Sequence, residues 1–206
     1  MAELKPVFLS GSRVSRATLH NAEEVKRRGI GIGDRVIIEK GGEIIPKVVR
    51  VTKKKSKSIW RMPAECPFCQ SPVVYKTNEV AARCSNPRCQ KKNFLRILFF
   101  IKNMDIDHIG AKVLEKLVDT GAITQIVDIY KLTEEDMKNL PGFKEKSIAN
   151  ILSSIEKSKS TELEQFIFAL GIPFVGERTA EIIVAKFGSL PAVSYTHLTL
   201  PTSDLV

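Results

Sequence analysis

The sequence has no apolar run long enough to cross a membrane. Its longest such run, residues 97–101, is bounded by Arg96 and Lys102, whereas a membrane-spanning helix needs about 18 to 20 predominantly apolar residues. The opening residues, MAELKPVF, do not resemble a secretory signal. We therefore expect a protein that makes no membrane contact and stays in the cytoplasm.

Acidic residues are the minority charge. Thirty-two Lys and Arg stand against twenty-three Asp and Glu, which gives a formal net charge of +9. This excess favours a polyanionic partner, most simply nucleic acid. Charge by itself leaves open the alternative of a basic protein with no such partner.

Cysteine is absent outside one short stretch, CPFCQSPVVYKTNEVAARCSNPRC at residues 66–89. Two closely spaced pairs separated by a short hairpin, expected at residues 73–75 and 80–82, predict a tetrahedral Zn²⁺ site with ligands Cys66, Cys69, Cys84 and Cys89. Four thiolates leave no open position for water or substrate, so the zinc would be structural. Two disulfides or four buried free thiols are the alternatives.

Short strands and one helix are predicted for residues 1–62. The expected elements are an extended segment at residues 6–14, a helix at residues 16–28 and strands at residues 35–40 and 43–51. Asn21 would cap the helix, Gly41-Gly42 would turn the hairpin, and Pro46 indicates a sheet edge or a bulge. This pattern suits a small OB-type β-barrel. The lysine-rich residues 53–57 would form a basic linker or loop.

Residues 93–192 contain an internal repeat with a period of about 33 residues. Its copies read IDHIGAK from Ile106, LPGFKEK from Leu140 and IPFVGER from Ile172, each between two predicted helices. After the second copy, for example, apolar residues fall at helical spacing at positions 148, 151, 152 and 155. We expect three all-α helix-hairpin-helix units.

Each hairpin would bind a phosphate group. The free N–H groups at the start of the second helix point outward, a Gly permits close approach, and a basic residue follows. The candidate residues are Gly110, Lys112, Gly142, Lys146, Gly176 and Arg178. The second copy is the weak one, because Lys144 stands where the other copies have Gly, and a role mainly in packing is the alternative for it. A helical solenoid for protein binding is the alternative.

These motifs together resemble one family, the NAD⁺-dependent DNA ligases of bacteria. The stretch from Val14 to Val48 is similar to the family's OB-fold, CPFC…RCSNPRC to its zinc finger, and MDIDHIGAKVLEKLVDTG with ALGIPFVGERTAEIIVAKFGSL to its helix-hairpin-helix domain. The resemblance implies a multidomain α+β chain. We expect an OB-fold at residues 1–62 without its first strand, a four-cysteine zinc finger at 63–92, three hairpins at 93–192 and a non-family tail at 193–206.

The resemblance also implies a reaction. In this family a lysine takes AMP from NAD⁺, AMP passes to the 5′ phosphate at a nick, and the 3′ hydroxyl displaces it. No Lys-x-Asp-Gly occurs in this sequence. The chain is therefore expected to grip nicked double-stranded DNA as a monomer without catalysing ligation, and NAD⁺ and Mg²⁺ would serve only the full-length enzyme.

Two other functions stay open, a base-excision glycosylase of the helix-hairpin-helix type and a non-catalytic scaffold. A glycosylase needs a catalytic Asp or Lys with a base pocket, and nothing singles one out. His20 and His108 have no recognisable carboxylate partner, which favours loop or packing roles. Further candidate DNA contacts on the barrel are Arg13, Arg16 and Lys40.

Overall fold

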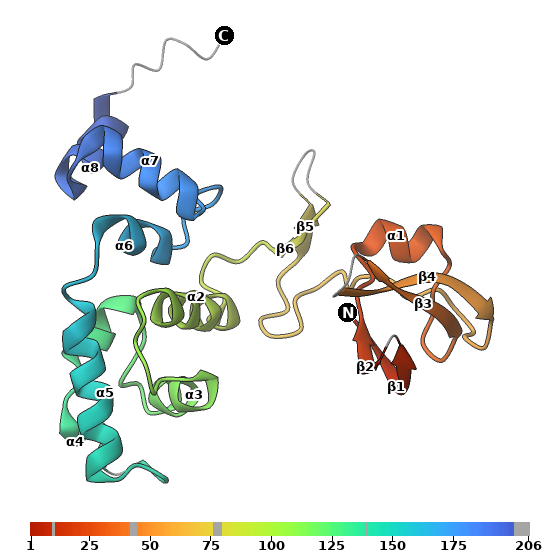
Figure 1. Ribbon diagram of the computed structural model, residues 1–206, viewed down its shortest axis with the longest axis horizontal. Coiled ribbons are helices and arrows are strands. Elements are labelled where there is room, and N and C mark those ends of the chain that lie inside the picture. Colours follow the sequence, from red (N-terminus) through yellow and green to blue (C-terminus); the bar gives the residue numbers. More distant parts are fainter. Residues whose placement is uncertain (10, 42–44, 76–79, 139, 200–206) are drawn as a thin grey trace. The chain divides into compact units, whose positions relative to one another are not determined.

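The computed structural model describes residues 1–206 except 10, 42–44, 76–79, 139 and 200–206. The chain divides into two compact units, Met1–Cys89 and Gln90–Val206 (Figure 1). The first unit holds the described strands and the cysteines, and the second is helical. Among the described residues, no helix combines the length and apolar character that a membrane crossing requires.

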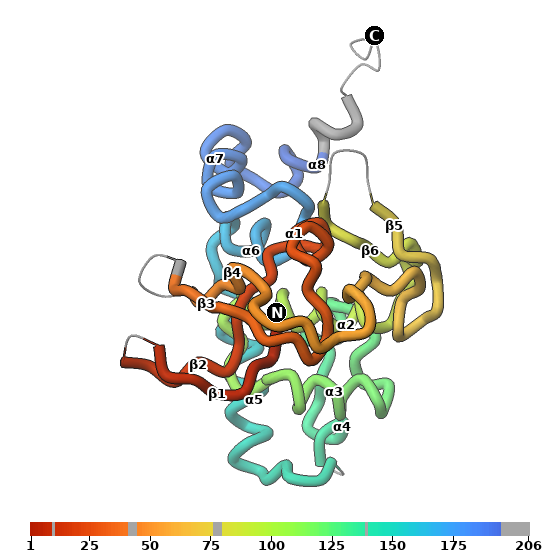
Figure 2. Tube along the Cα trace, turned by 90° about the vertical axis from the view of Figure 1, so that its right-hand side faces the viewer, coloured from red at the N-terminus to blue at the C-terminus, as the bar shows by residue number. Residues whose placement is uncertain are grey.

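Two antiparallel hairpins and a short helix make up most of the first unit. The β1–β2 and β3–β4 hairpins can each be followed along the tube in Figure 2. Thr18 links the hairpins, because its N–H donates to Pro46 O (2.8 Å) and its carbonyl accepts from Val48 N (3.0 Å). The elements are β1 Ala2–Leu9, β2 Ser12–Ala17, α1 Ala22–Arg27, β3 Arg35–Gly41 and β4 Ile45–Lys53.

A small core holds this part together. Ala17, Val25, Ile30 and Val48 are buried, one from each of β2, α1, the loop after α1, and β4. Trp60, the single tryptophan of the chain, packs against this cluster, and its backbone N–H donates to Ile30 O at 2.9 Å. The short antiparallel strands agree with the OB-type fold expected from the sequence.

The helix predicted at residues 16–28 is too long. Arg16 belongs to β2, where it lies opposite Glu3, and the helix begins only at Ala22. Asn21 caps it as expected, since its Oδ1 accepts a hydrogen bond from Glu24 N at 2.9 Å. Strand pairing therefore decides the conformation before Asn21. The extended segment predicted at residues 6–14 is likewise divided between β1 and β2.

Pro46 lies in regular register opposite Lys40 in the β3–β4 hairpin. The irregularities of this hairpin fall elsewhere, between Arg35 and Val36 and between Ile37 and Ile38. Glu43, Ile44 and Gly42, which the sequence places in the turn and the start of the second strand, lie outside the described residues. Observed β4 runs two residues further than predicted, to Lys53.

The lysine-rich loop after β4 is anchored by a carboxylate. The side chain of Asp34 is fully covered, and it accepts hydrogen bonds from Lys55 N (2.8 Å), Ser56 N (2.7 Å) and Gly31 N (2.9 Å). Lys54 Nζ lies 3.3 Å from the same carboxylate. Residues 54–56 thus form an ordered loop rather than a free linker.

The second unit is built from helices around one core. Phe100 lies at its centre and makes edge-to-face ring contacts with Tyr130 and Phe166, both with centroids 6.3 Å apart. The elements are α2 Gln90–Asn103, α3 Ala111–Asp119, η1 Ile126–Lys131, α4 Glu134–Lys138, α5 Glu145–Ser158, α6 Leu163–Ala169, α7 Glu177–Phe187 and α8 Leu190–Thr199.

The three predicted hairpins are the pairs α2–α3, α4–α5 and α6–α7 (Figure 1). Ile148, Ile151 and Ile155 are buried on one face of α5, as their spacing predicts. The 3₁₀ helix η1 between the first two hairpins was not predicted, although its Ile129 is fully buried. Helix α8 enters the stretch 193–206 that the sequence sets apart.

Candidate metal centre and nucleic-acid interface

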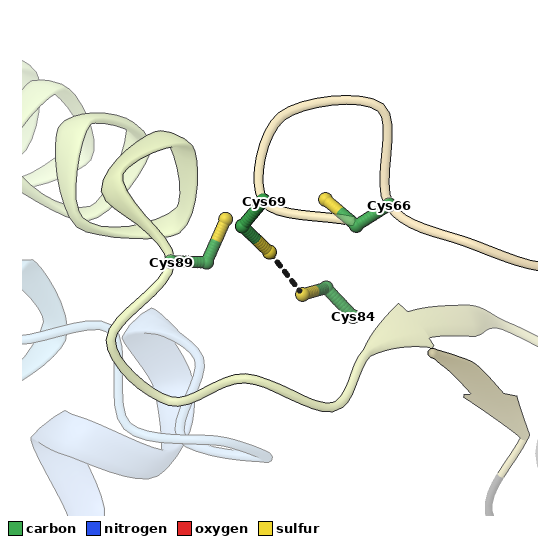
Figure 3. Close-up of side chains that lie close together, drawn as sticks. All are labelled: Cys66, Cys69, Cys84 and Cys89. Carbon is green, nitrogen blue, oxygen red and sulfur yellow. Dashed lines mark hydrogen bonds between the residues drawn. The ribbon is translucent and has the colours of Figure 1, made fainter. Parts of the chain in front are cut away.

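Four cysteine side chains converge on one point in the first unit (Figure 3). Cys66 and Cys69 come from one tight loop, Cys84 ends β6, and Cys89 immediately precedes α2. Strands β5 Val73–Tyr75 and β6 Ala82–Cys84 form the short hairpin between the two pairs. The second of these strands lies two residues further along the chain than predicted.

The spacing of the sulfurs fits a tetrahedral zinc ion. All four Sγ atoms lie within 4.8 Å of one another, and Cys69 Sγ and Cys84 Sγ are 3.4 Å apart. Zn–S bonds of about 2.3 Å in a tetrahedron place sulfurs about 3.8 Å apart, which falls between these two distances. None of the four cysteines, all of which the structure describes, forms a disulfide, so the structure does not support the alternative of two disulfides.

Backbone hydrogen bonds shape the first knuckle. Cys66 N donates to Ser71 O and Gln70 N donates to Cys66 O, both at 2.8 Å. Gln70 adopts a left-handed conformation with φ 58°, which closes the loop and turns both thiols inward. The chain therefore positions this pair of sulfurs through its own main chain.

The surroundings of Cys69 and Cys84 shift the pKa values of their thiols in opposite directions. Hydrogen bonding from Ser71 lowers the pKa of the Cys69 thiol to about 6. Burial raises the pKa of the Cys84 thiol to about 11. A divalent cation among the sulfurs would favour the thiolate at every position, because a coordinated thiol loses its proton.

The three hairpins share one backbone geometry at the start of the second helix. Gly110, Lys144 and Gly176, which occupy the same place in the sequence repeat, are the N-caps of α3, α5 and α7. All three have extended backbone, and none has a side chain that caps the helix. The first-turn N–H groups of these helices are thus left for another acceptor.

The glycine N-caps are open to approach. A Cβ added at Gly110 or Gly176 would meet no atom within 4 Å. Gly142 does not share this place, since it lies two residues before its N-cap with φ 91°. The residues at the same repeat position as Gly142 are His108 (φ 66°) and Phe174 (φ 68°), which are left-handed as well.

Comparison with known families accounts for these parts in order. The NAD-dependent DNA ligase OB-fold domain matches residues 1–59, and the NAD-dependent DNA ligase C4 zinc finger domain matches residues 65–90. A SAM-like helix-hairpin-helix tandem matches residues 100–157, and a helix-hairpin-helix motif matches residues 165–199. This segment belongs to the NAD-dependent DNA ligase family.

Several proteins named DNA ligase are similar to this chain. A DNA ligase of Chlamydia caviae is 51% identical over 198 residues, and one of Chlamydia felis is 50% identical over 203 residues. These alignments cover 94% and 96% of this chain but 30% and 31% of the relatives. A DNA ligase of Protochlamydia amoebophila is 42% identical over 212 residues. The chain thus spans about a third of the length of the ligases it matches.

The zinc prediction is confirmed in this ligase segment. The C4 zinc finger family covers the cysteine stretch, and the described residues bring four sulfurs to one point there. Such a site is closed by its four sulfurs and structural in kind. The multidomain α+β fold class is confirmed as well.

The basic residues predicted on the hairpins of the ligase segment are all exposed. Lys112, Lys146 and Arg178 are each the second residue of the helix that follows the hairpin turn. Arg178 Nη1 lies 2.6 Å from Glu181 Oε2 on the same helix. This ion pair, which the sequence analysis did not foresee, reduces the positive charge at the third hairpin.

The candidates on the strands lie on two different hairpins. Arg13 and Arg16 are exposed on β2, and Arg16 Nη2 is 3.9 Å from Glu3 Oε1. Lys40 is half-buried on β3. The structure therefore does not join these three residues into one described site.

A lysine that the sequence analysis missed holds the turn of the second hairpin. Lys116 on α3 donates to Pro141 O, and its Nζ lies 5.8 Å from the centre of the Phe143 ring. A hollow beside this turn is lined by Lys138, Lys144 and Lys146. Nothing in the local sequence singles out Lys116, because only the fold brings it to residues 141 and 143.

Proposed function

We propose that this chain is the DNA-gripping part of an NAD⁺-dependent DNA ligase, which seals nicks between a 5′ phosphate and a 3′ hydroxyl in duplex DNA. The observation that supports it best is the order of the matches. Two domains described as parts of this enzyme and two helix-hairpin-helix matches follow one another along a single chain.

Within that function the helix starts bind the sugar-phosphate backbone. The uncapped amides beyond Gly110 and Gly176 present N–H donors with the positive end of a helix dipole. Lys112 and Lys146 add positive charge beside them, and Arg178 adds less because it is paired with Glu181. Contacts of this kind position a duplex without reading its sequence, as sealing nicks at any sequence requires.

The metal and the domain limits complete the proposal. Cys66, Cys69, Cys84 and Cys89 each donate one thiolate to Zn²⁺, which holds the finger in shape and takes no part in chemistry. The OB-fold takes residues 1–62, the zinc finger residues 63–92 and the hairpins residues 93–192, and residues 193–206 lie outside these domains.

Adenylation by NAD⁺ with Mg²⁺ is not assigned to these residues, since they contain no Lys-x-Asp-Gly. The chain acts as a monomer in the bacterial cytoplasm.

A gel-shift titration tests the function. Nicked and intact duplexes of one sequence are compared at two salt concentrations, with and without a zinc chelator. We expect salt-sensitive binding, with log K falling about 0.9 per log unit of salt for each phosphate neutralised, and weaker binding after chelation. Binding that is absent at low salt, or that ignores salt, would favour the scaffold function instead.

A further inference from the structure

We propose that Phe174, at the tip of the third hairpin, is a further DNA-contacting residue whose ring packs against the sugar and base edge of a nucleotide in the minor groove. His108 occupies the same place in the first hairpin and makes the corresponding contact. The inference rests on the proposed function. It concerns two residues at the turn of the repeat, of which the sequence analysis gave only His108 a role, in a loop or in packing.

Phe174 is both strained and unpacked. Its φ of 68° is left-handed, a conformation that disfavours a bulky side chain. Its side chain is 85% exposed, so the ring gains almost no burial in return. A bulky residue in a strained backbone conformation whose side chain is not buried in the protein points to a role in binding something outside it.

The first hairpin has an exposed, left-handed ring at the same position. His108 is exposed and left-handed at the equivalent repeat position, whereas the second hairpin has Gly142 there. Glycine adopts this conformation without penalty, so the fold of the hairpin does not require a ring. The apolar residues one position later, Ile109 and Val175, are buried or half-buried, and they fill the space between the helices instead.

The neighbouring groups identify the ligand. Phe174 lies two residues before Gly176, so their Cα atoms are at most about 7.6 Å apart. A phosphate bound at the open amides after Gly176 would place the next sugar and base edge within reach of the ring. Apolar side chains inserted at base steps from the minor groove are a known way of holding a duplex.

The test separates the ring from the strain. Phe174→Ala removes the ring and keeps a side chain in the left-handed conformation, Phe174→Gly removes both, and Phe174→Trp keeps an aromatic ring. We expect affinity for a nicked duplex to fall at least about fivefold in the Ala and Gly variants and to stay within about twofold of wild type in the Trp variant. Phe174→Gly should melt no lower than wild type and above Phe174→Ala.

A matched control is Val127→Ala in η1, which is 48% exposed and should bind as wild type does. His108→Gly should weaken binding without lowering the melting temperature. Unchanged affinity in Phe174→Ala and Phe174→Gly, with wild type still bound in a salt-dependent manner, would overturn this inference and leave the proposed function standing. A wild-type chain that does not bind duplex DNA would overturn both.

Discussion

Asp34 is a single residue that orders a run of lysines. Its covered carboxylate accepts three backbone N–H groups and lies beside Lys54 Nζ. Hydrogen bonds, first among them the one from Ser56 N, hold the pKa of Asp34 well below its usual range. Local sequence does not reveal this role, because Lys54, Lys55 and Ser56 lie about twenty residues further along the chain.

Asp34→Asn should destabilise the first unit in a pH-dependent way. The pKa of Asp34 is depressed in the folded state, so the ionised carboxylate contributes stability above its unfolded pKa, about 3.9. That contribution is lost progressively as the pH falls below about 4. We expect the variant to melt below wild type at pH 7 and the gap to narrow towards pH 3.

Fluorescence of Trp60 measures this, since the chain has no other tryptophan and Trp60 packs on the core of the first unit. Glu39→Gln, which alters an exposed carboxylate on β3, is the control and should leave the melting temperature unchanged at both pH values. A gap between Asp34→Asn and wild type that is the same at pH 3 and pH 7 would contradict the argument.

Gly31 shows another limit of sequence reasoning at this scale. A Cβ at residue 31 would collide with Ser58 O and Ser56 Oγ. Nothing in the local sequence distinguishes this glycine from Gly33, where an added Cβ would meet no atom within 4 Å but φ is 92°. One position requires glycine for space and the other for conformation.

At the scale of elements, the repeat was the most informative part of the sequence. Alignment of the three copies predicts equivalent helix starts, and the structure places an N-cap at the same position of each. The prediction succeeded because local signals, turn residues followed by helical periodicity, agree with the fold here.

Secondary-structure prediction failed elsewhere. The helix predicted from residue 16 is a strand at residues 16–17, because pairing with β1 decides the conformation there, and η1 was missed because its six residues show no clear period.

Gly176→Val tests the role of a helix start. Residue 176 has φ −89° and open space around a Cβ, so valine should fit without disturbing the fold. Its branched side chain would cover the first-turn amides of α7. We expect duplex affinity to fall about tenfold, since a hydrogen bond to a charged acceptor contributes about 1.5–3 kcal/mol, with an unchanged melting temperature.

Gly188→Val is the matched control on the same helix. Gly188 ends α7 in a left-handed conformation with φ 70°, which valine adopts only with strain. This variant should melt lower than wild type while its folded fraction binds DNA normally. Equal affinity of Gly176→Val and wild type would remove the amides of α7 from the binding surface.

At the scale of the whole molecule, the metal site could be predicted almost completely. Four cysteines at this spacing leave few arrangements, and the sulfurs lie where the spacing requires. The group that acts on the site could not be predicted, because Ser71 affects Cys69 through the geometry of the loop. The contact from Lys116 to Pro141 in the helical unit could not be predicted either, because the two residues are 25 positions apart in the sequence. The division of the chain into a strand-built and a helical unit followed from composition and periodicity.

Removing the zinc should loosen the finger. Metal binding and folding are coupled in sites of this kind, so a chelator or Cys84→Ser should raise the rate of proteolysis within residues 63–89 on the order of tenfold. Elemental analysis and mass spectrometry of the fragments measure the two effects. Ser85→Ala, which keeps all four sulfurs and the backbone bond to Pro72 O (2.9 Å), should retain both metal and protection. Full protection after complete metal loss would argue against a structural role.

The anchored loop at residues 54–56 has a thermodynamic consequence. Its backbone is already held by Asp34, which also binds the backbone at Gly31. An anion that binds the lysines of this loop therefore does not have to order a flexible segment. Association then loses less conformational entropy than it would with a flexible basic segment. Affinity at this loop would come from charge that is already held in place before binding.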